Sequence, residues 1–106
     1  MYIVLFITTP NKKLARDIAS SLVGKGLAAC VNIIPHIDSI FKWEGKTDKQ
    51  KECLLIVKSK KSRLAELIKV TKALHSYKVP EIIAFPIIAG SKDYLDWWNE
   101  SVRKSS

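Results

Sequence analysis

The sequence predicts an α+β domain in which helices pack against one face of a four-stranded sheet. Three observations support this prediction. Strand and helix patterns alternate in the order β-α-β-β-α-β-α, a short polar segment joins two of the strands, and the length of 106 residues suits one domain over residues 1–106.

The N-terminal part of the chain predicts a buried strand followed by a helix. Residues 2–8 form a short apolar run rich in β-branched and aromatic side chains, typical of a central strand. Thr9 and Pro10 suit an N-cap and a first helical position, so we expect a helix up to Val23, ended by Gly24 and Gly26. Its apolar stripe consists of Leu14, Ile18 and Leu22.

The middle of the chain predicts a long hairpin. Residues 27–43 alternate like a strand, with a bulge expected at 34–36 because Pro35 cannot donate to a ladder. Residues 44–50 are polar and contain Gly45, so we expect them to form the turn. Residues 52–59 then return as the third strand.

A second helix and a fourth strand follow the hairpin. Residues 60–77 carry apolar side chains at helical spacing. Residues 79–88 predict a strand that Pro80 and Pro86 restrict to a sheet edge or to strand ends.

A last short helix is expected after Gly90 and Ser91, with an apolar stripe of Leu95, Trp98 and Val102, and residues 103–106 are expected to fray. Right-handed crossovers around the hairpin make this order a ferredoxin-like βαββαβ sandwich with an extra C-terminal helix. The strand over 27–43 is far longer than usual and ends in Phe41 and Trp43. We therefore expect a second subunit to cover the overhanging hairpin.

Composition excludes several classes of protein. No segment is apolar for long enough to cross a membrane, and no signal peptide is recognisable, so we expect a cytoplasmic protein. The two cysteines, Cys30 and Cys53, are expected to be free thiols. The net charge of +8 invites a nucleic-acid hypothesis, but the lysines are dispersed along the chain, so we expect no nucleic-acid partner.

Three segments, in order along nearly the whole chain, resemble signatures of the CutA family of divalent-cation tolerance proteins. They are residues 28–35 followed by 43–46, residues 52–59, and residues 75–83 followed by Pro86, Gly90, Tyr94, Leu95 and Trp97. The resemblance implies a ferredoxin-like protomer and a homotrimer formed through strand pairing between subunits. It also implies a role in the response to metal ions, with copper binding, and no settled enzymatic reaction.

The candidate metal ligands are His75, Glu81 and Cys30, since imidazole and thiolate suit copper or zinc. Two other interpretations stay open. Cys30 could be a small buried core residue, and His75 could simply stabilise the C-terminal end of a helix. A candidate ligand cleft contains Trp43, Lys58 and Tyr77, whose residue types are common in binding sites.

A metal chaperone of this fold needs a CxxC motif in the first β-α loop, and that motif is absent here. An RNA-recognition domain needs aromatic residues for base stacking on the third strand, and residues 53–57 contain none. No catalytic constellation is evident, so we expect no enzyme. The function predicted is a homotrimer that binds copper or another divalent metal at clefts between subunits. The alternative is a trimeric signalling or protein-interaction scaffold that binds a small ligand or a partner protein.

Overall fold

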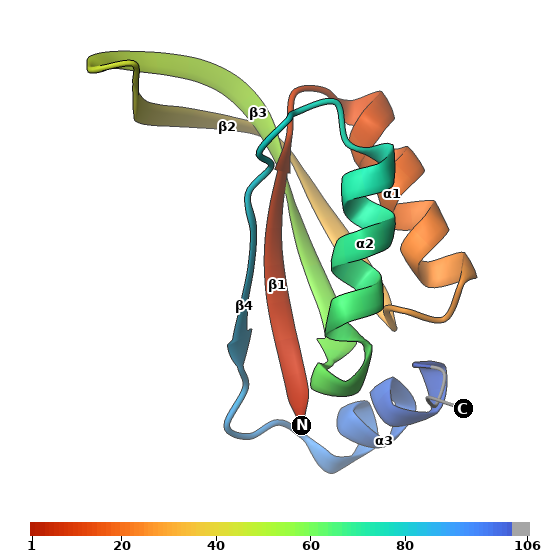
Figure 1. Cartoon of the computed structure of the whole chain (residues 1–106). Helices are drawn as coiled ribbons and strands as arrows, with labels where there is room; N and C mark the ends of the chain where they lie inside the picture. Colours follow the sequence, from red (N-terminus) through yellow and green to blue (C-terminus); the bar gives the residue numbers. More distant parts are fainter. Residues whose placement is uncertain (103–106) are drawn as a thin grey trace.

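The computed structural model describes residues 1–102, and its strands form one antiparallel sheet in the order β2-β3-β1-β4 (Figure 1). The elements are β1 (Tyr2–Thr9), α1 (Lys12–Gly24), β2 (Cys30–Trp43), β3 (Lys46–Lys60), a 3-10 turn (Lys61–Arg63), α2 (Leu64–Leu74), β4 (Ile82–Pro86) and α3 (Lys92–Ser101). The predicted α+β, ferredoxin-like order of elements is confirmed.

Helices α1 and α2 cover the same face of the sheet (Figure 1). The core lies between them and consists of fully buried side chains from both layers, namely Leu5, Ile7, Leu55 and Val57 of the sheet and Ile18, Leu22 and Leu67 of the helices. Burial of these aliphatic groups is the main stabilising term for a domain of this size.

The N-cap of α1 is Asn11, whereas the sequence predicted Thr9. The Asn11 side chain accepts a hydrogen bond from the Leu14 amide at 2.8 Å. Thr9 instead ends β1 and is fully buried, and its hydroxyl donates to the Asn11 carbonyl at 3.0 Å. The strand therefore runs further than expected, and the cap falls on the next residue that has a suitable side chain.

The hairpin differs most from the prediction. Strand β2 begins at Cys30 rather than at residue 27, and the turn is only Glu44 and Gly45, with φ values of 51° and 79°. These left-handed conformations are typical of a two-residue hairpin turn, and they let β3 begin at Lys46, well before residue 52. The bulge is confirmed, since the pairing register shifts between Ile34 and Ile37.

Helix α2 and strand β4 are both shorter than predicted. The helix starts at Leu64 after the 3-10 turn and ends at Leu74, because His75 has an extended backbone with ψ 143°. Strand β4 is limited to five residues that end at Pro86, and it lies at the sheet edge as predicted. The predicted fraying of 103–106 falls outside the described residues.

Helix α3 packs on the sheet face that α1 and α2 leave open, at one end of that face. Trp98 is buried there, its ring meets Tyr2 edge-on at 5.3 Å, and its indole N–H donates to the Ser59 carbonyl at 2.9 Å. Val102 and Leu95 join this second cluster, so the predicted stripe is confirmed. Within residues 1–102, no helix is long and apolar enough to cross a bilayer.

Beyond α3, the open face of the sheet is apolar and uncovered. Ile34, Ile83 and Phe85 are 40%, 53% and 39% exposed, and half-buried apolar side chains from β1 and β3 lie between them, namely Val4, Phe6, Leu54 and Ile56. A surface of this kind is typical of a contact with another protein surface.

Candidate functional site

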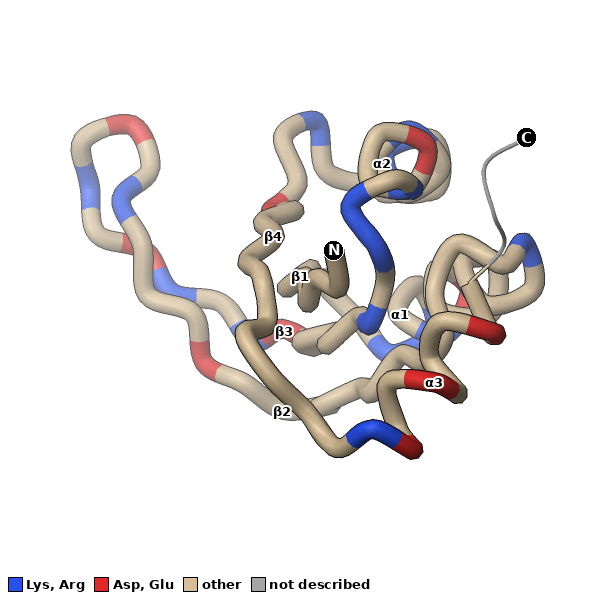
Figure 2. Tube along the Cα trace, turned by 90° about the horizontal axis from the view of Figure 1, so that it is seen from below, with Lys and Arg blue, Asp and Glu red and all other residues tan. Residues whose placement is uncertain are grey.

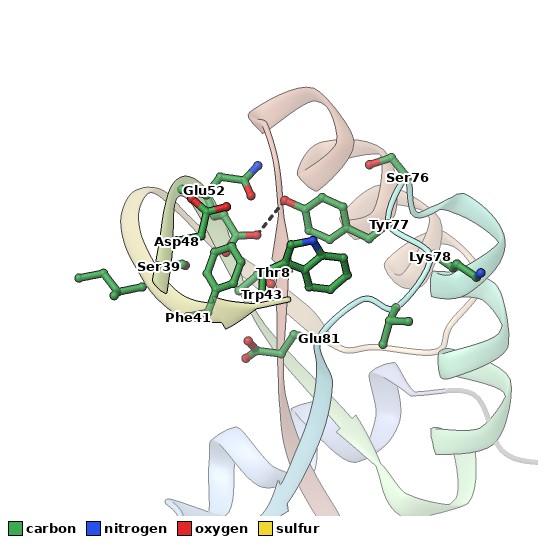
Figure 3. A pocket seen from close by; sticks show the side chains of 13 residues that line it. Thr8, Ser39, Phe41, Trp43, Asp48, Glu52, Ser76, Tyr77, Lys78 and Glu81 are labelled. Atoms are coloured by element: carbon green, nitrogen blue, oxygen red, sulfur yellow. Dashed lines mark hydrogen bonds between the residues drawn. The ribbon is translucent and has the colours of Figure 1, made fainter. Parts of the chain in front are cut away.

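A cleft of about 790 Å³ lies between the overhanging hairpin and the segment that follows α2 (Figure 3). The hairpin wall is formed mainly by alternate residues of β2 and β3, and the opposite wall by the segment that leads to β4. The principal lining residues are Ser39, Phe41, Trp43, Asp48, Gln50 and Glu52 on one side, Ser76, Tyr77, Lys78, Val79 and Glu81 on the other, and Thr8 between them.

Strand pairing explains why the hairpin residues share one wall. Phe41 pairs with Asp48 and Ser39 pairs with Gln50 across the ladder. Directly paired residues point to the same face of a sheet, and every second residue does so along each strand. The long hairpin therefore presents one continuous polar and aromatic face to the cleft.

A hydrogen bond between Tyr77 and Glu52 crosses the cleft. The Tyr77 hydroxyl donates to Glu52 Oε2 at 2.9 Å, and Glu52 is only 9% exposed (Figure 3). Burial, followed by this hydrogen bond and the charge of Glu52, raises the pKa of Tyr77 to about 12. Tyr77 is therefore a neutral phenol at physiological pH and acts as a donor.

His75 lies beside Tyr77 and fixes the start of the same segment. Its Nδ1 accepts the Tyr77 backbone N–H at 3.0 Å, so its Nε2 carries the ring proton and donates to the Thr8 carbonyl at 2.7 Å. The two rings are also in contact, with centroids 4.9 Å apart. His75 thus holds the segment after α2 against the end of β1.

The cleft is acidic although the chain is basic. Asp48, Glu52 and Glu81 line it, with Lys78 as the one lysine among the lining residues, whereas the whole chain carries a net charge of +8. Figure 2 shows the basic positions spread over the hairpin, helices and loops, with acidic positions among them. This local charge favours a cationic ligand.

The family model described as "CutA1 divalent ion tolerance protein" matches residues 3–101. The chain belongs to this family. It is 47% identical over 98 residues to the divalent-cation tolerance protein CutA of Thermus thermophilus, and this match covers 92% of the chain and 95% of that protein. It is 46% identical over 101 residues to the chloroplastic protein CutA of Arabidopsis thaliana, which covers 95% of the chain and 56% of that protein.

Solved CutA1 structures have the same fold. The Thermus thermophilus protein superposes with a TM-score of 0.95 at 46% identity, covering 97% of this chain and all (100%) of that chain. CutA1 from Oryza sativa gives a TM-score of 0.95 at 46% identity and covers 98% of this chain and 95% of that chain. The chain spans a little over half the length of the plant CutA proteins to which it is similar, 56% and 58%.

The residues predicted from the CutA resemblance fall in two places. Trp43, Tyr77 and Glu81 line the cleft together, and His75 lies behind Tyr77. Lys58 does not line it, because its ammonium group lies 4.0 Å from the Cys30 thiol, its cross-strand partner.

Lys58 pairs with Val4 of β1, and Val4 is four residues from Thr8 on the same strand. Lys58 and Cys30 are therefore about 13 Å from Thr8 along the strand direction, at the usual strand rise. One chain therefore does not bring Cys30 to His75 and Glu81. Within residues 1–102, no three or more His, Cys, Asp or Glu side chains are grouped so as to hold a metal ion.

Both cysteines are free thiols, as predicted, and the buried Cys53 donates to the Pro35 carbonyl at the bulge. Sequence reasoning missed Phe41, Asp48, Gln50 and Glu52 as cleft residues. A signal was present, because Asp48, Gln50 and Glu52 recur with the period of two that places side chains on one strand face.

Proposed function

We propose that this chain acts as a homotrimer in the response to divalent metal ions, and that it binds copper or another divalent metal at clefts between subunits. The observation that carries the proposal is the excess of carboxylates in the cleft of a member of the divalent ion tolerance family. Relatives that align over nearly their full length are named divalent-cation tolerance proteins, which supports the same role.

A single chain leaves two surfaces uncovered, and both favour assembly. The hairpin projects beyond the body of the domain (Figure 1), and the open sheet face exposes Ile34, Ile83 and Phe85. Strands β2 and β4 are both sheet edges whose ladder groups can pair with another chain. Three copies that pair these edges and pack their open faces together would bury both surfaces.

Oxygen donors in the cleft favour metal binding, since Glu81 and Asp48 are exposed there. For His75 to join them, its Nδ1 must give up the Tyr77 amide, at a cost of about 1 kcal/mol for one hydrogen bond. A site that contains all three predicted ligands needs Cys30 from a neighbouring subunit.

Sedimentation velocity and calorimetric titration with cupric and zinc ions test this proposal together. We expect a trimer that binds metal more weakly in Glu81→Gln and His75→Ala, whereas Glu100→Gln on α3 serves as the control for loss of one carboxylate. A monomer at micromolar concentration, or equal metal affinity in all variants, would contradict it.

We further propose that the protein binds without catalysing a reaction. Two groups that often act as bases are committed elsewhere, because Tyr77 keeps its proton and both ring nitrogens of His75 are hydrogen-bonded. The second candidate function is a scaffold for a partner protein, which the exposed apolar sheet face favours. The cytoplasmic location stays a prediction.

A further inference from the structure

Half of the basic residues of the chain gather on the layer formed by α1 and α2. This helix layer (residues 11–25 and 60–74) carries nine Lys or Arg and two Asp or Glu, a net charge of +7. The rest of the chain carries nine basic and eight acidic residues and is nearly neutral. Lysines that are dispersed along the sequence, from which we expected no nucleic-acid partner, are therefore concentrated on one side of the fold.

The basic side chains form two groups, one at each end of the helix layer. The two helices lie side by side and run in opposite directions, so the start of α1 lies near the end of α2 (Figure 1). One group is Lys12, Lys13, Arg16, Lys69 and Lys72, and the other is Lys25, Lys60, Lys61 and Arg63. Most of these residues are exposed, and the 13 residues of α1 separate the groups by about 20 Å.

The two acidic residues of the helix layer do not oppose an anionic partner. Asp17 forms a salt bridge of 3.0 Å with Lys13, and Glu66 forms one of 2.8 Å with Arg63. Both carboxylates are thus neutralised within the layer. An approaching anion therefore meets an excess of positive charge over the whole layer.

We propose that the helix layer binds the phosphate backbone of double-stranded nucleic acid, independently of base sequence. Phosphate contacts of this kind need a basic surface and no pocket, because the affinity comes from neutralisation of phosphates and release of their counterions. A basic stripe along one face of a small domain is the usual mark of such binding.

The residue types of the helix layer favour a duplex over other anionic partners. The layer contains no Phe, Trp, Tyr or His, so it offers no ring on which single-stranded bases can stack. It also lacks the aromatic anchors that hold a helix in a membrane interface. Lysine is depleted from protein–protein interfaces, whereas it is a common contact of phosphate groups.

The proposed trimer leaves this surface accessible. Helices α1 and α2 cover one face of the sheet, and the trimer packs the opposite, open faces together and pairs the edges β2 and β4. The helix layer of each subunit then points outward. A duplex can reach it in the trimer as well as in a single chain, and the inference does not depend on metal binding.

Fluorescence anisotropy of a labelled DNA duplex of about 20 base pairs, titrated with the full chain, tests the inference. In about 50 mM NaCl without divalent metal ions, we expect a dissociation constant of about 10 µM or below. The logarithm of the affinity should fall with the logarithm of the salt concentration, with a slope of about −0.9 for each phosphate contacted. A single strand of the same length should bind more weakly, because it has half the phosphates.

Two double variants separate the helix layer from the net charge of the protein. Lys12→Gln with Lys72→Gln removes two exposed charges from one end of the layer, and Lys46→Gln with Lys92→Gln removes two from the hairpin and α3. We expect the first pair to weaken duplex binding about tenfold and to reduce the salt slope by about 2. The second pair should stay within about twofold of the wild type.

Sedimentation of each variant shows whether assembly is preserved. If the Lys46 and Lys92 pair alters assembly, Lys72→Gln against Lys92→Gln decides, with a loss of about threefold expected only for Lys72→Gln. Equal weakening by the layer and control variants would overturn the inference, because it would assign binding to net charge alone. No duplex binding up to about 100 µM protomer, tighter binding of the single strand, or binding to phosphatidylserine vesicles without duplex binding would overturn it as well.

Discussion

Tyr77 and Glu52 join two parts of the chain that are distant in sequence, through a hydrogen bond of 2.9 Å. Tyr77 belongs to the segment between α2 and β4, and Glu52 lies in β3 where the hairpin leaves the body of the sheet. The pair therefore closes the base of the cleft and sets the position of one wall relative to the other.

Replacement of Tyr77 by Phe should destabilise the fold by about 1.5 kcal/mol, because Glu52 is nearly buried and loses a donor to its charge. Urea denaturation at a fixed protomer concentration measures this change. Tyr94→Phe, which removes a hydroxyl from the exposed surface of α3, is the matched control. Equal midpoints for the two variants would show that the bond contributes nothing to stability.

Alkaline titration should reveal the same pair. The pKa of Tyr77 is about 12 in the folded chain, against 10.0 for an ordinary tyrosine. Between these values the unfolded chain has lost the proton that the folded chain retains, so the free energy of unfolding falls as pH rises from about 10 to 12. The stabilising effect is fully present below about pH 10.

The other tyrosines and the lysines also titrate in this range, so the informative quantity is the difference between wild type and Tyr77→Phe. We expect this difference to shrink as pH rises through the window. A difference that stays constant up to pH 12 would contradict the raised pKa of Tyr77.

The periodicity of apolar residues predicted the fold, but it did not predict where each helix and strand begins and ends. The stripe Leu14, Ile18 and Leu22 identified α1, and Pro35 identified the bulge. The predicted turn, residues 44–50, was too long because residues 46–50 are polar, a composition that is typical of a loop. In the structure these residues pair with β2 in a ladder. A strand can pair in this way even when both of its faces are exposed to solvent.

The candidate site was predicted only in part. The structure brings two of the predicted cleft residues, Trp43 and Tyr77, to one cleft together with Glu81, which was predicted as a metal ligand. Lys58 does not line this cleft, since its strand register puts it beside Cys30. Register depends on the hairpin turn, so an error in the turn removes any basis for pairing residues across the sheet.

The two adjacent tryptophans of α3 should differ sharply in importance. Trp98 is 3% exposed and donates to the Ser59 carbonyl, whereas Trp97 is 44% exposed. Trp98→Ala should cost about 3 kcal/mol or more, because it leaves a cavity and removes the indole hydrogen bond to the Ser59 carbonyl. Trp97→Ala should cost less than about 1 kcal/mol. Thermal unfolding of the two variants, side by side, makes the comparison, and similar losses would refute the anchoring role of Trp98.

The open sheet face provides a direct test of assembly. Ile56 lies near the middle of this face, opposite Phe6 and Asn32 in the ladder, and its side chain points away from the core between the sheet and α1 and α2. A carboxylate at this position remains half-exposed in a single chain, so Ile56→Asp should leave the protomer folded. In a trimer that packs these faces together, the same charge is buried without a partner, which costs several kcal/mol.

We therefore expect Ile56→Asp to sediment as a monomer with an unchanged far-ultraviolet circular dichroism spectrum. Val23→Asp, on the exposed side of α1, introduces the same charge on a different surface and should leave assembly unchanged. Phe85→Ala, on the same open face, should weaken assembly without adding charge, since it removes a half-exposed ring from the proposed contact. If Ile56→Asp assembles like the wild type, the open face is not the contact between subunits, and the sheet edges with the projecting hairpin must account for any oligomer.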